Sequence, residues 1–279
     1  MSDKKSLGVR FEFGRNWNRF LKILDEVRIL EAENSIKQML EIEDLRGMRF
    51  LDVGSGSGLF SLAARRLGGS VHSFDFDPFS VACTHELKRC YFPDDENWTI
   101  EQGDVLNHNY LNSLGQFDVV YSWGVLHHTG KMWQALENVA PLVRNGGELF
   151  ISVYNDQGNA SRRWRLVKKF YNQSSKPVRL MLVLGVGAMS QTYAALVRLC
   201  QGRTPFPFKA WGDKKKNRGM SVWHDLVDWV GGYPFEVAKP EEIFDFYRKK
   251  GFVLTKLKTC GGGLGCNEFV FRRKNRTVT

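Results

Sequence analysis

The sequence has few cysteines and no long uninterrupted apolar run. Its five cysteines are scattered and include no CxxC pair, so it predicts neither a disulfide framework nor a zinc site, and a reducing cytoplasm suits it. The first residues, MSDKKSLGVRFEFG, contain no apolar run, and we expect no secretory signal there. No stretch reaches about 18 consecutive apolar residues. The segment that comes nearest, 180–197, is interrupted by Ser190, Gln191 and Thr192.

The 279 residues are 43% hydrophobic and 25% charged, which is a globular composition long enough for one large domain or two modest ones. From residue 49, short apolar runs alternate with helical patterns, which predicts an α/β fold with a mostly parallel sheet. The predicted strands are 49–53, 70–74, 98–101, 117–122, 148–154, 252–258 and 268–273. The predicted helices are 15–45, a run from the glycine-rich turn to about 67, 78–90, 132–143 and 239–250.

The alternation is interrupted once, which divides the chain into four parts. We expect an N-terminal helical cap (1–47), a core (48–155), an insertion (156–238), and a last helix with two strands that complete the core (239–279). We read the chain as one domain carrying an insertion. The aromatic residues Phe11, Phe13 and Trp17 would either cover a ligand or pack on the sheet edge.

The glycine-rich turn after the first predicted strand, Leu51-Asp52-Val53-Gly54-Ser55-Gly56-Ser57-Gly58-Leu59, lets a ligand approach the backbone at a helix N-terminus. A P-loop needs a lysine after its last glycine, and none follows here. The dinucleotide pattern G-x-G-x-x-G also fails, because Leu59 or Ser61 stands at its third glycine. The spacing G-x-G-x-G after an acidic residue is the pattern of S-adenosylmethionine (SAM) methyltransferases.

Two aspartates in register with this turn support the SAM interpretation. Asp75 ends the second strand, where a carboxylate can accept both ribose hydroxyls, and Asp104 follows the third strand, where it can meet the adenine amino group. Either one alone could instead be a solvated helix cap. The backbone of residues 122–130 would pass the methionine end of SAM. The predicted cofactor contacts are Asp52, Gly54, Ser55, Gly56, Gly58, Asp75, Phe76, Asp104, Val105, Ser122 and Trp123.

Several motifs in order resemble the core of the class I SAM-dependent methyltransferases: LDVGSGSG, FDFDP, GDVL, FDVVYSWGVLHH and LVRNGGELFISVYN. The resemblance implies a Rossmann-like, seven-stranded sheet whose last strand is antiparallel, with FVLTKLKT and NEFVFRR as the final hairpin. The nearest subfamily is the ubiquinone-biosynthesis type of O-methyltransferase, which the insertion resembles through RLMLVLGVGAMSQ, WHDLVDW and KPEEIFDFY. Gly124 and His127 stand where members of that subfamily can carry metal-binding glutamates, so we predict no metal site.

Methyl transfer to oxygen usually needs a base, and three histidines are candidates. His128 follows the fourth strand, and His224 lies beside Asp225 in the insertion. We assign His128, His224 and Asp225 to catalysis. The third histidine, His127, also follows the fourth strand, and we favour it less as a base. Each histidine could instead be structural. The predicted acceptor is the hydroxyl of a small molecule that is lipophilic, quinol-like, or linked to a glycan or lipid. The alternatives are a tRNA or other macromolecule, because LHHTG resembles a segment of some tRNA wobble-uridine methyltransferases, and a non-catalytic SAM-binding subunit.

The net charge of +10 is concentrated in the insertion. Residues 156–218 hold 14 Lys and Arg but two Asp and Glu, whereas the rest of the chain holds 26 and 28. The two basic clusters are Arg162, Arg163, Arg165, Lys168 and Lys169, and Lys214, Lys215, Lys216 and Arg218. Around an apolar segment they favour contact of 160–218 with an anionic membrane surface, ahead of a lid or homodimer helix and ahead of RNA. We therefore expect a cytoplasmic protein that associates with a membrane.

Overall fold

The computed structural model describes residues 11, 24–202, 204 and 222–275, except for the side chains of residues 222, 224 and 225. It divides the chain into two compact units. The larger unit comprises residues 12–161 and 235–279, and the smaller unit comprises residues 1–11 and 162–234. Phe13, Trp17 and the second basic cluster lie outside the described residues. The predicted insertion and the smaller unit share residues 162–234.

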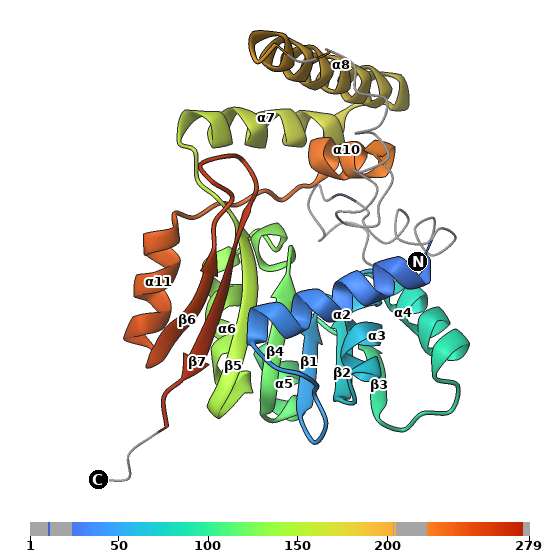
Figure 1. Ribbon diagram of the computed structural model, residues 1–279, viewed down its shortest axis with the longest axis vertical. Coiled ribbons are helices and arrows are strands. Elements are labelled where there is room, and N and C mark those ends of the chain that lie inside the picture. The colour runs from blue at the N-terminus through green and yellow to red at the C-terminus, as the bar shows by residue number, and fades with distance from the viewer. Residues whose placement is uncertain (1–10, 12–23, 203, 205–221, 276–279) are drawn as a thin grey trace. The chain divides into compact units, whose positions relative to one another are not determined.

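The larger unit is built on a seven-stranded sheet in the order β3-β2-β1-β4-β5-β7-β6 (Figure 1). The strands are β1 (Arg49–Val53), β2 (Ser70–Asp75), β3 (Trp98–Gln102), β4 (Phe117–Trp123), β5 (Val143–Tyr154), β6 (Phe252–Lys258) and β7 (Cys266–Arg273). Strands β1 to β5 pair in parallel, and β7 runs antiparallel to both β5 and β6. The seven-stranded sheet with an antiparallel last strand is confirmed.

Helices connect these strands, and their ends follow local sequence signals. The helices are α2 (Glu26–Leu40), α3 (Leu59–Arg66), α4 (Pro78–Tyr91), α5 (His108–Leu114), α6 (Met132–Val139) and α11 (Pro240–Lys249), with the 3-10 turns η1 (Leu126–His128) and η2 (Ala140–Leu142). Asp25 and Asp77 cap α2 and α4 by accepting backbone N–H bonds. We did not predict α5, whose cap is Asn107.

Two predicted helices have wrong bounds. The helix expected over 15–45 corresponds to α2, which begins at Glu26 after the extended cap Asp25 and ends at Leu40, because Glu41 adopts a left-handed conformation. The helix expected over 132–143 ends at Val139, and β5 begins at Val143, which pairs with Phe117. Pro141 lies in η2 between them, and a proline cannot donate the backbone hydrogen bond that a continuing helix requires. The pair Gly146-Gly147, which we took as the helix stop, therefore lies inside the strand.

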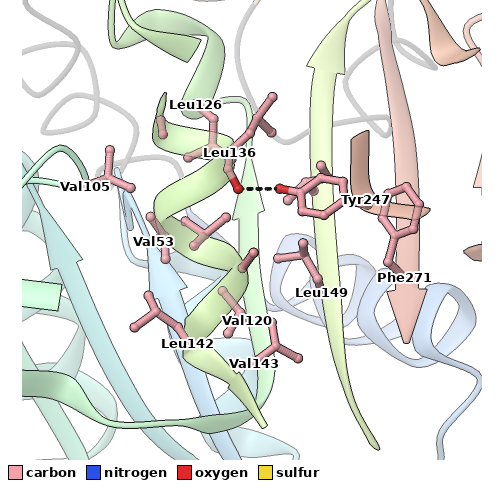
Figure 2. Packing of buried hydrophobic residues seen from close by; sticks show 14 of the residues in the cluster. Val53, Val105, Val120, Leu126, Leu136, Leu142, Val143, Leu149, Tyr247 and Phe271 are labelled. Atoms are coloured by element: carbon pink, nitrogen blue, oxygen red, sulfur yellow. Dashed lines mark hydrogen bonds between the residues drawn. The ribbon is translucent and has the colours of Figure 1, made fainter. Parts of the chain in front are cut away.

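The main core lies between the sheet and its helices (Figure 2). Strands β1, β4 and β5 bury side chains on the face covered by α6, including Val53, Val120 and Leu149. On α11, Tyr247 is fully buried, and its hydroxyl donates to the Leu136 carbonyl oxygen at 2.9 Å. Burial of a tyrosine is compatible with stability here because its polar end has a partner.

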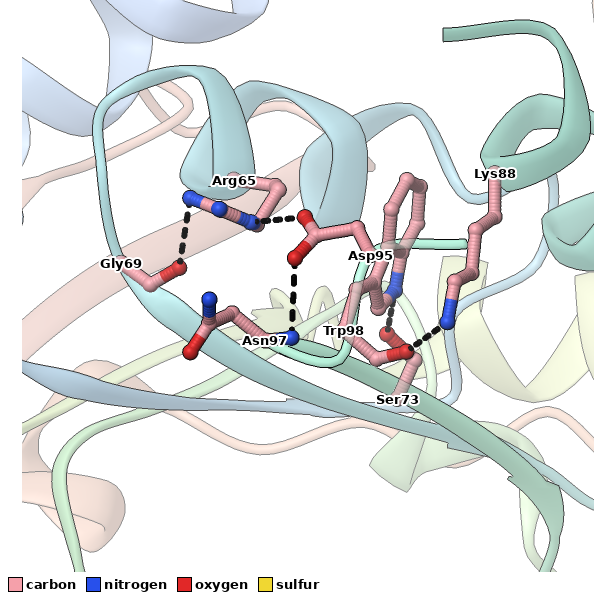
Figure 3. Close-up of polar contacts among 7 residues, drawn as sticks. All are labelled: Arg65, Gly69, Ser73, Lys88, Asp95, Asn97 and Trp98. Atoms are coloured by element: carbon pink, nitrogen blue, oxygen red, sulfur yellow. Dashed lines mark hydrogen bonds and ion pairs between the residues drawn. The ribbon is translucent and has the colours of Figure 1, made fainter. Parts of the chain in front are cut away.

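Polar contacts fasten the outer strand β3 to its neighbours (Figure 3). The indole of Trp98 donates to the Ser73 hydroxyl at 2.9 Å, and Lys88 of α4 donates to the Trp98 carbonyl at 2.6 Å. Arg65 of α3 pairs with Asp95, just before β3. These contacts hold α3 and α4 against the strands whose ends carry the predicted cofactor contacts.

The connection between β6 and β7 is anchored by two buried asparagines. The Asn155 side chain donates to the Gly263 carbonyl at 3.1 Å, and the Asn267 side chain donates to the Asn155 side-chain oxygen at 3.1 Å. Asn267 also accepts the Cys260 N–H at 3.1 Å. The chain passes this point twice, because Asn155 pairs with Ala238 in a parallel bridge and the Ala238 N–H donates to the Tyr154 carbonyl.

The smaller unit consists mainly of helices α7 (Asn159–Gln173), α8 (Lys176–Cys200) and α10 (Val222–Gly231), although the first residues of α7 belong to the larger unit. Its small core is formed by Tyr171, Val183 and Val230. Lys168 is fully buried, donates to the Trp229 carbonyl and lies 4.5 Å from the centre of the Trp229 ring.

Candidate functional site

The glycine-rich turn links β1 to α3 at the carboxyl ends of the parallel strands. Gly54, Gly56 and Gly58 all have positive φ angles, of 83°, 56° and 81°, which side-chain-bearing residues rarely adopt. A Cβ on Gly54 would lie 2.4 Å from Val125, and one on Gly58 would lie 2.9 Å from the Thr84 Cα. Glycine is thus required at Gly54 and Gly58, and the turn stays partly exposed at Gly54 and Gly56.

Asp75 fastens the turn to the end of β2. One oxygen of its carboxylate accepts the Gly56 N–H at 2.9 Å, and the other accepts the Asp77 N–H at 2.8 Å. A carboxylate has about four lone-pair sites, so these two bonds do not exhaust its acceptor capacity. The side chain is partly exposed. It can therefore accept hydroxyl groups of a ligand that lies against the turn.

Asp104 lies beside Asp75 at the next strand end. The Gly103 N–H donates to the Asp75 carbonyl at 3.0 Å, which holds the two strand ends together. The Asp104 carboxylate accepts the Leu106 N–H at 2.8 Å, and Val105 is buried. The Phe76 carbonyl accepts from the Gln102 side chain at 3.1 Å. The structure therefore brings these predicted residues to one edge of the sheet.

Asp52 lies beneath the turn. Only 2% of it is exposed, and its carboxylate accepts the Ser61 hydroxyl of α3. Ser73 in turn donates to Ser61 at 2.8 Å, which continues this buried chain to Trp98. Burial raises the pKa of Asp52 to about 7. The hydrogen bond from Ser61 lowers this pKa, whereas the nearby Asp75 carboxylate raises it. Asp52 connects β1 to α3, and its role as a cofactor contact stays a prediction.

The end of β4 carries the last predicted cofactor contacts. Ser122 is buried, and its hydroxyl donates to the Val53 carbonyl at 3.0 Å, so its side chain links β4 to β1. Trp123 is partly exposed. The Gly124 N–H donates to the Ser152 hydroxyl at 2.9 Å, and a Cβ there would meet nothing within 4 Å. The backbone therefore has open space where β4 ends.

His127 and His128 lie in η1, within an aromatic cluster. The His128 ring is 5.6 Å from the Tyr154 ring, the His127 ring is 4.3 Å from it, and Phe235 lies 5.0 Å from Tyr154 between ring centres. His128 is 6% exposed. We did not single out Tyr154 or Phe235 from the sequence. The position of Tyr154 at the end of a predicted strand was the available signal; Phe235 offered none.

His224 and Asp225 lie on α10, in the smaller unit, and their side chains are outside the described part of the structure. Their assignment to catalysis stays a prediction. Among the described residues, no group of three or more His, Cys, Asp and Glu side chains could hold a metal ion.

The residues at this edge fit SAM. The turn has room for glycine alone at Gly54 and Gly58, and Gly54 and Gly56 are partly exposed to a ligand. The carboxylates of Asp75 and Asp104, on neighbouring strand ends, supply acceptors for ribose hydroxyls and an adenine amino group.

Comparison with known proteins agrees with this geometry. Residues 51–149 match the family model described as a methyltransferase domain. The ubiquinone biosynthesis O-methyltransferase of Escherichia coli O139:H28 is 31% identical over 118 residues, which cover 42% of this chain and 47% of that protein. The match thus spans about half the length of the curated relative.

Two solved structures share the fold. One is the crystal structure of magnesium protoporphyrin IX methyltransferase from Synechocystis PCC 6803 with bound SAH. The match covers 93% of this chain and 94% of that protein's chain, with a TM-score of 0.55 and 14% identity. The other is an O-methyltransferase family protein from Burkholderia thailandensis. The match covers 94% of this chain and 69% of that protein's chain, with a TM-score of 0.53 and 12% identity. Residues 51–149 therefore match a methyltransferase domain, and the chain shares the fold of solved methyltransferases.

Proposed function

We propose that this protein transfers a methyl group from SAM to a hydroxyl oxygen of a small molecule. The observation that carries the proposal is the bond between the Gly56 N–H and the Asp75 carboxylate, within a positive-φ glycine turn of a methyltransferase domain. The name of the E. coli relative, an O-methyltransferase of ubiquinone biosynthesis, supports oxygen as the accepting atom.

Bound SAM would supply an activated methyl group on its sulfonium. The chain would contribute binding and alignment: the turn and Asp75 hold the ribose side, Asp104 accepts from the adenine, and the end of β4 passes the methionine side. His128 would accept the proton of the acceptor hydroxyl, because a neutral imidazole titrates in the useful range. Tyr154 and Phe235 would limit access of water to this base.

The acceptor class is tested by incubating the protein with methyl-labelled SAM and separate pools of lipids, small molecules and RNA from the source cells. We expect label in the small-molecule or lipid pool. Label in RNA alone would make the protein a macromolecule methyltransferase. Tight SAM binding without transfer to any pool would make it a non-catalytic SAM-binding subunit. Either result contradicts the proposal.

The base is tested with His128→Asn and the matched variant His85→Asn, because His85 is an exposed histidine of α4. We expect His128→Asn to lower turnover about 100-fold, the usual scale of a lost general base, without changing the SAM Kd. His85→Asn should leave both values unchanged. Equal turnover of the two variants would remove His128 from the mechanism.

His224 and Asp225 remain proposed contributors to acceptor orientation. Replacing His224 with alanine should reduce turnover on the identified acceptor while SAM affinity, measured by calorimetry, stays constant. Unchanged turnover would exclude the residue from catalysis.

A further inference from the structure

Helix α8 presents a large apolar surface to solvent. It is the one helix of the described chain that is long and apolar enough to cross a membrane, with 25 residues, of which Val183 alone is buried. The exposed large apolar side chains are Leu180, Met181, Leu184, Met189, Tyr193, Leu196, Val197 and Leu199. Met189 and Tyr193 are 61% and 71% exposed. So many exposed apolar side chains on one helix indicate an interaction site.

The opposite side of α8 rests on its own unit. Val183 is buried, and Leu182 and Val186 pack against the core formed with Tyr171 and Val230. A Cβ on Gly187 would lie 2.9 Å from Leu226 of α10, so the two helices are close at this glycine. Helix α8 is thus attached along its first half and cannot be surrounded by lipid on all sides while this packing persists.

Helix α7 lies next to α8 in Figure 1 and carries positively charged residues. Residues 159–200 contain eight Lys and Arg residues but no Asp or Glu. Arg162, Arg163, Arg165, Lys169 and Lys176 are exposed. Lys168 belongs to the predicted basic cluster but is buried against Trp229, so it adds no surface charge.

Two exposed apolar residues of α7 lie within its basic face. Leu166 and Phe170 are one helical turn apart, with Arg163 and Lys169 close to them in sequence and also exposed. Alternation of cations with exposed apolar side chains is typical of helices that lie in the headgroup region of a bilayer.

We propose that α7 and α8 form a docking surface for an anionic lipid bilayer, with α8 lying in the plane of the interface. The charges on α7 are complementary to anionic headgroups, and the apolar side chains of α8 match the acyl boundary. A second copy of this chain would bring another cluster of the same sign against the first, because no acidic residue lies in 159–200. A spanning orientation would place Ser190, Gln191 and Thr192 near the middle of the hydrocarbon.

Co-sedimentation of the full chain with vesicles tests the proposal. Phosphatidylcholine vesicles containing phosphatidylglycerol should bind the protein at least about tenfold more tightly than pure phosphatidylcholine vesicles, and added salt should weaken this binding. Leu184→Glu on α8 and the charge reversal Arg163→Glu on α7 should each lower vesicle affinity about tenfold or more.

Matched control variants lie in the larger unit. Val27→Glu replaces an apolar residue of α2 that is 59% exposed, and Lys131→Glu reverses an exposed charge. Both should bind vesicles like the unchanged protein. Circular dichroism and SAM binding establish that every variant is folded.

Four results of the vesicle and oligomer measurements would overturn the proposal. They are equal binding to neutral and anionic vesicles, equal effects of the test and control variants, protein that resists alkaline carbonate extraction as a spanning protein does, and a dimer that Leu184→Glu dissociates without any vesicle binding. Salt-sensitive binding to RNA but not to vesicles would also contradict it. The SAM-binding measurement is separate from all of these, so failure here does not bear on the proposed activity.

Discussion

Gly54 and Gly47 both have positive φ angles, of 83° and 74°, but only Gly54 lies in a crowded position. Nothing lies within 4 Å of a Cβ built on Gly47, whereas one on Gly54 would collide with Val125. Alanine at either site costs roughly 1 kcal/mol of stability through backbone strain. We expect Gly54→Ala also to weaken SAM binding about tenfold or more, measured by calorimetry. Equal SAM affinity of Gly54→Ala and Gly47→Ala would contradict the assignment of the turn.

Asp52 gives stability an unusual pH dependence. Its pKa of about 7 in the folded protein lies above the ordinary value of 3.8, so the folded state holds the proton more tightly than the unfolded state. The stabilisation is fully present below pH 4 and is lost as pH rises towards 7. Asp52→Asn keeps a neutral side chain at every pH, so its stability relative to the unchanged protein should increase over this range by up to about 4 kcal/mol. Urea unfolding at several pH values measures this.

Asp44→Asn provides the opposite trend as a control. The pKa of Asp44 is lowered, chiefly by its bond to the Arg46 side chain, so its stabilising effect is present above the ordinary pKa and disappears in acid. Asp44→Asn should therefore have a lower free energy of unfolding than the unchanged protein at neutral pH. The two free energies should become equal as pH falls. Parallel pH trends for Asp52→Asn and Asp44→Asn would be inconsistent with a buried, protonated Asp52.

At the site, the sequence predicted those residues whose type is dictated locally. Glycines at positive φ and aspartates at strand ends can be recognised from spacing alone, and the structure brings Gly56, Asp75 and Asp104 to one edge. Thr84 and Tyr154 could not be predicted, because their contacts with Gly58 and His128 depend on tertiary packing. A sequence pattern carries no information about such long-range neighbours.

At the scale of elements, several strands were predicted almost to the residue. Strand β6 has the predicted bounds, and β2 is longer by one residue. The helix expected over 15–45 corresponds to the shorter α2. The other errors concern short or mixed elements. Helix α5 is only seven residues long, and η2 separates α6 from β5 by a proline turn that resembles helix in composition.

The asparagine pair that anchors the β6–β7 connection should contribute strongly to stability. Asn267 is buried and bonds both the Asn155 side chain and the Cys260 N–H. Asn267→Ala leaves these groups without their partner, which should lower the free energy of unfolding by about 2 kcal/mol. Asn112→Ala, at an exposed position of α5, is the matched control and should have little effect. Urea titration of both variants would disprove the anchor if their stabilities were equal.

At the scale of the whole molecule, the larger unit is discontinuous in sequence but continuous in its hydrogen bonding. The Asp156 N–H donates to the Ala238 carbonyl, and Asn155 bridges to Ala238, so the points of departure and return are adjacent. The smaller unit has a core of its own around Val183 and Val230. Neither the sheet nor its main core includes residues from 162–234.

Replacing residues 162–234 with a short flexible linker should therefore leave a folded protein that binds SAM. We expect a cooperative thermal transition by circular dichroism and a SAM Kd within about threefold of the full chain. The shortened protein should no longer bind anionic vesicles. Loss of the cooperative transition would show that the larger unit depends on the smaller one.

The late position of β7 in the chain affects the order in which the molecule can be completed. Strand β7 pairs with β5 from Glu148 to Tyr154, but it is made last, after the whole smaller unit. Closing so long a loop adds little entropy cost, since that cost rises only with the logarithm of length. During synthesis, however, β5 keeps an open edge until residue 273 has left the ribosome. The nascent chain thus passes through a stage in which a helical unit is finished while the sheet beside β5 is still a template for mispairing.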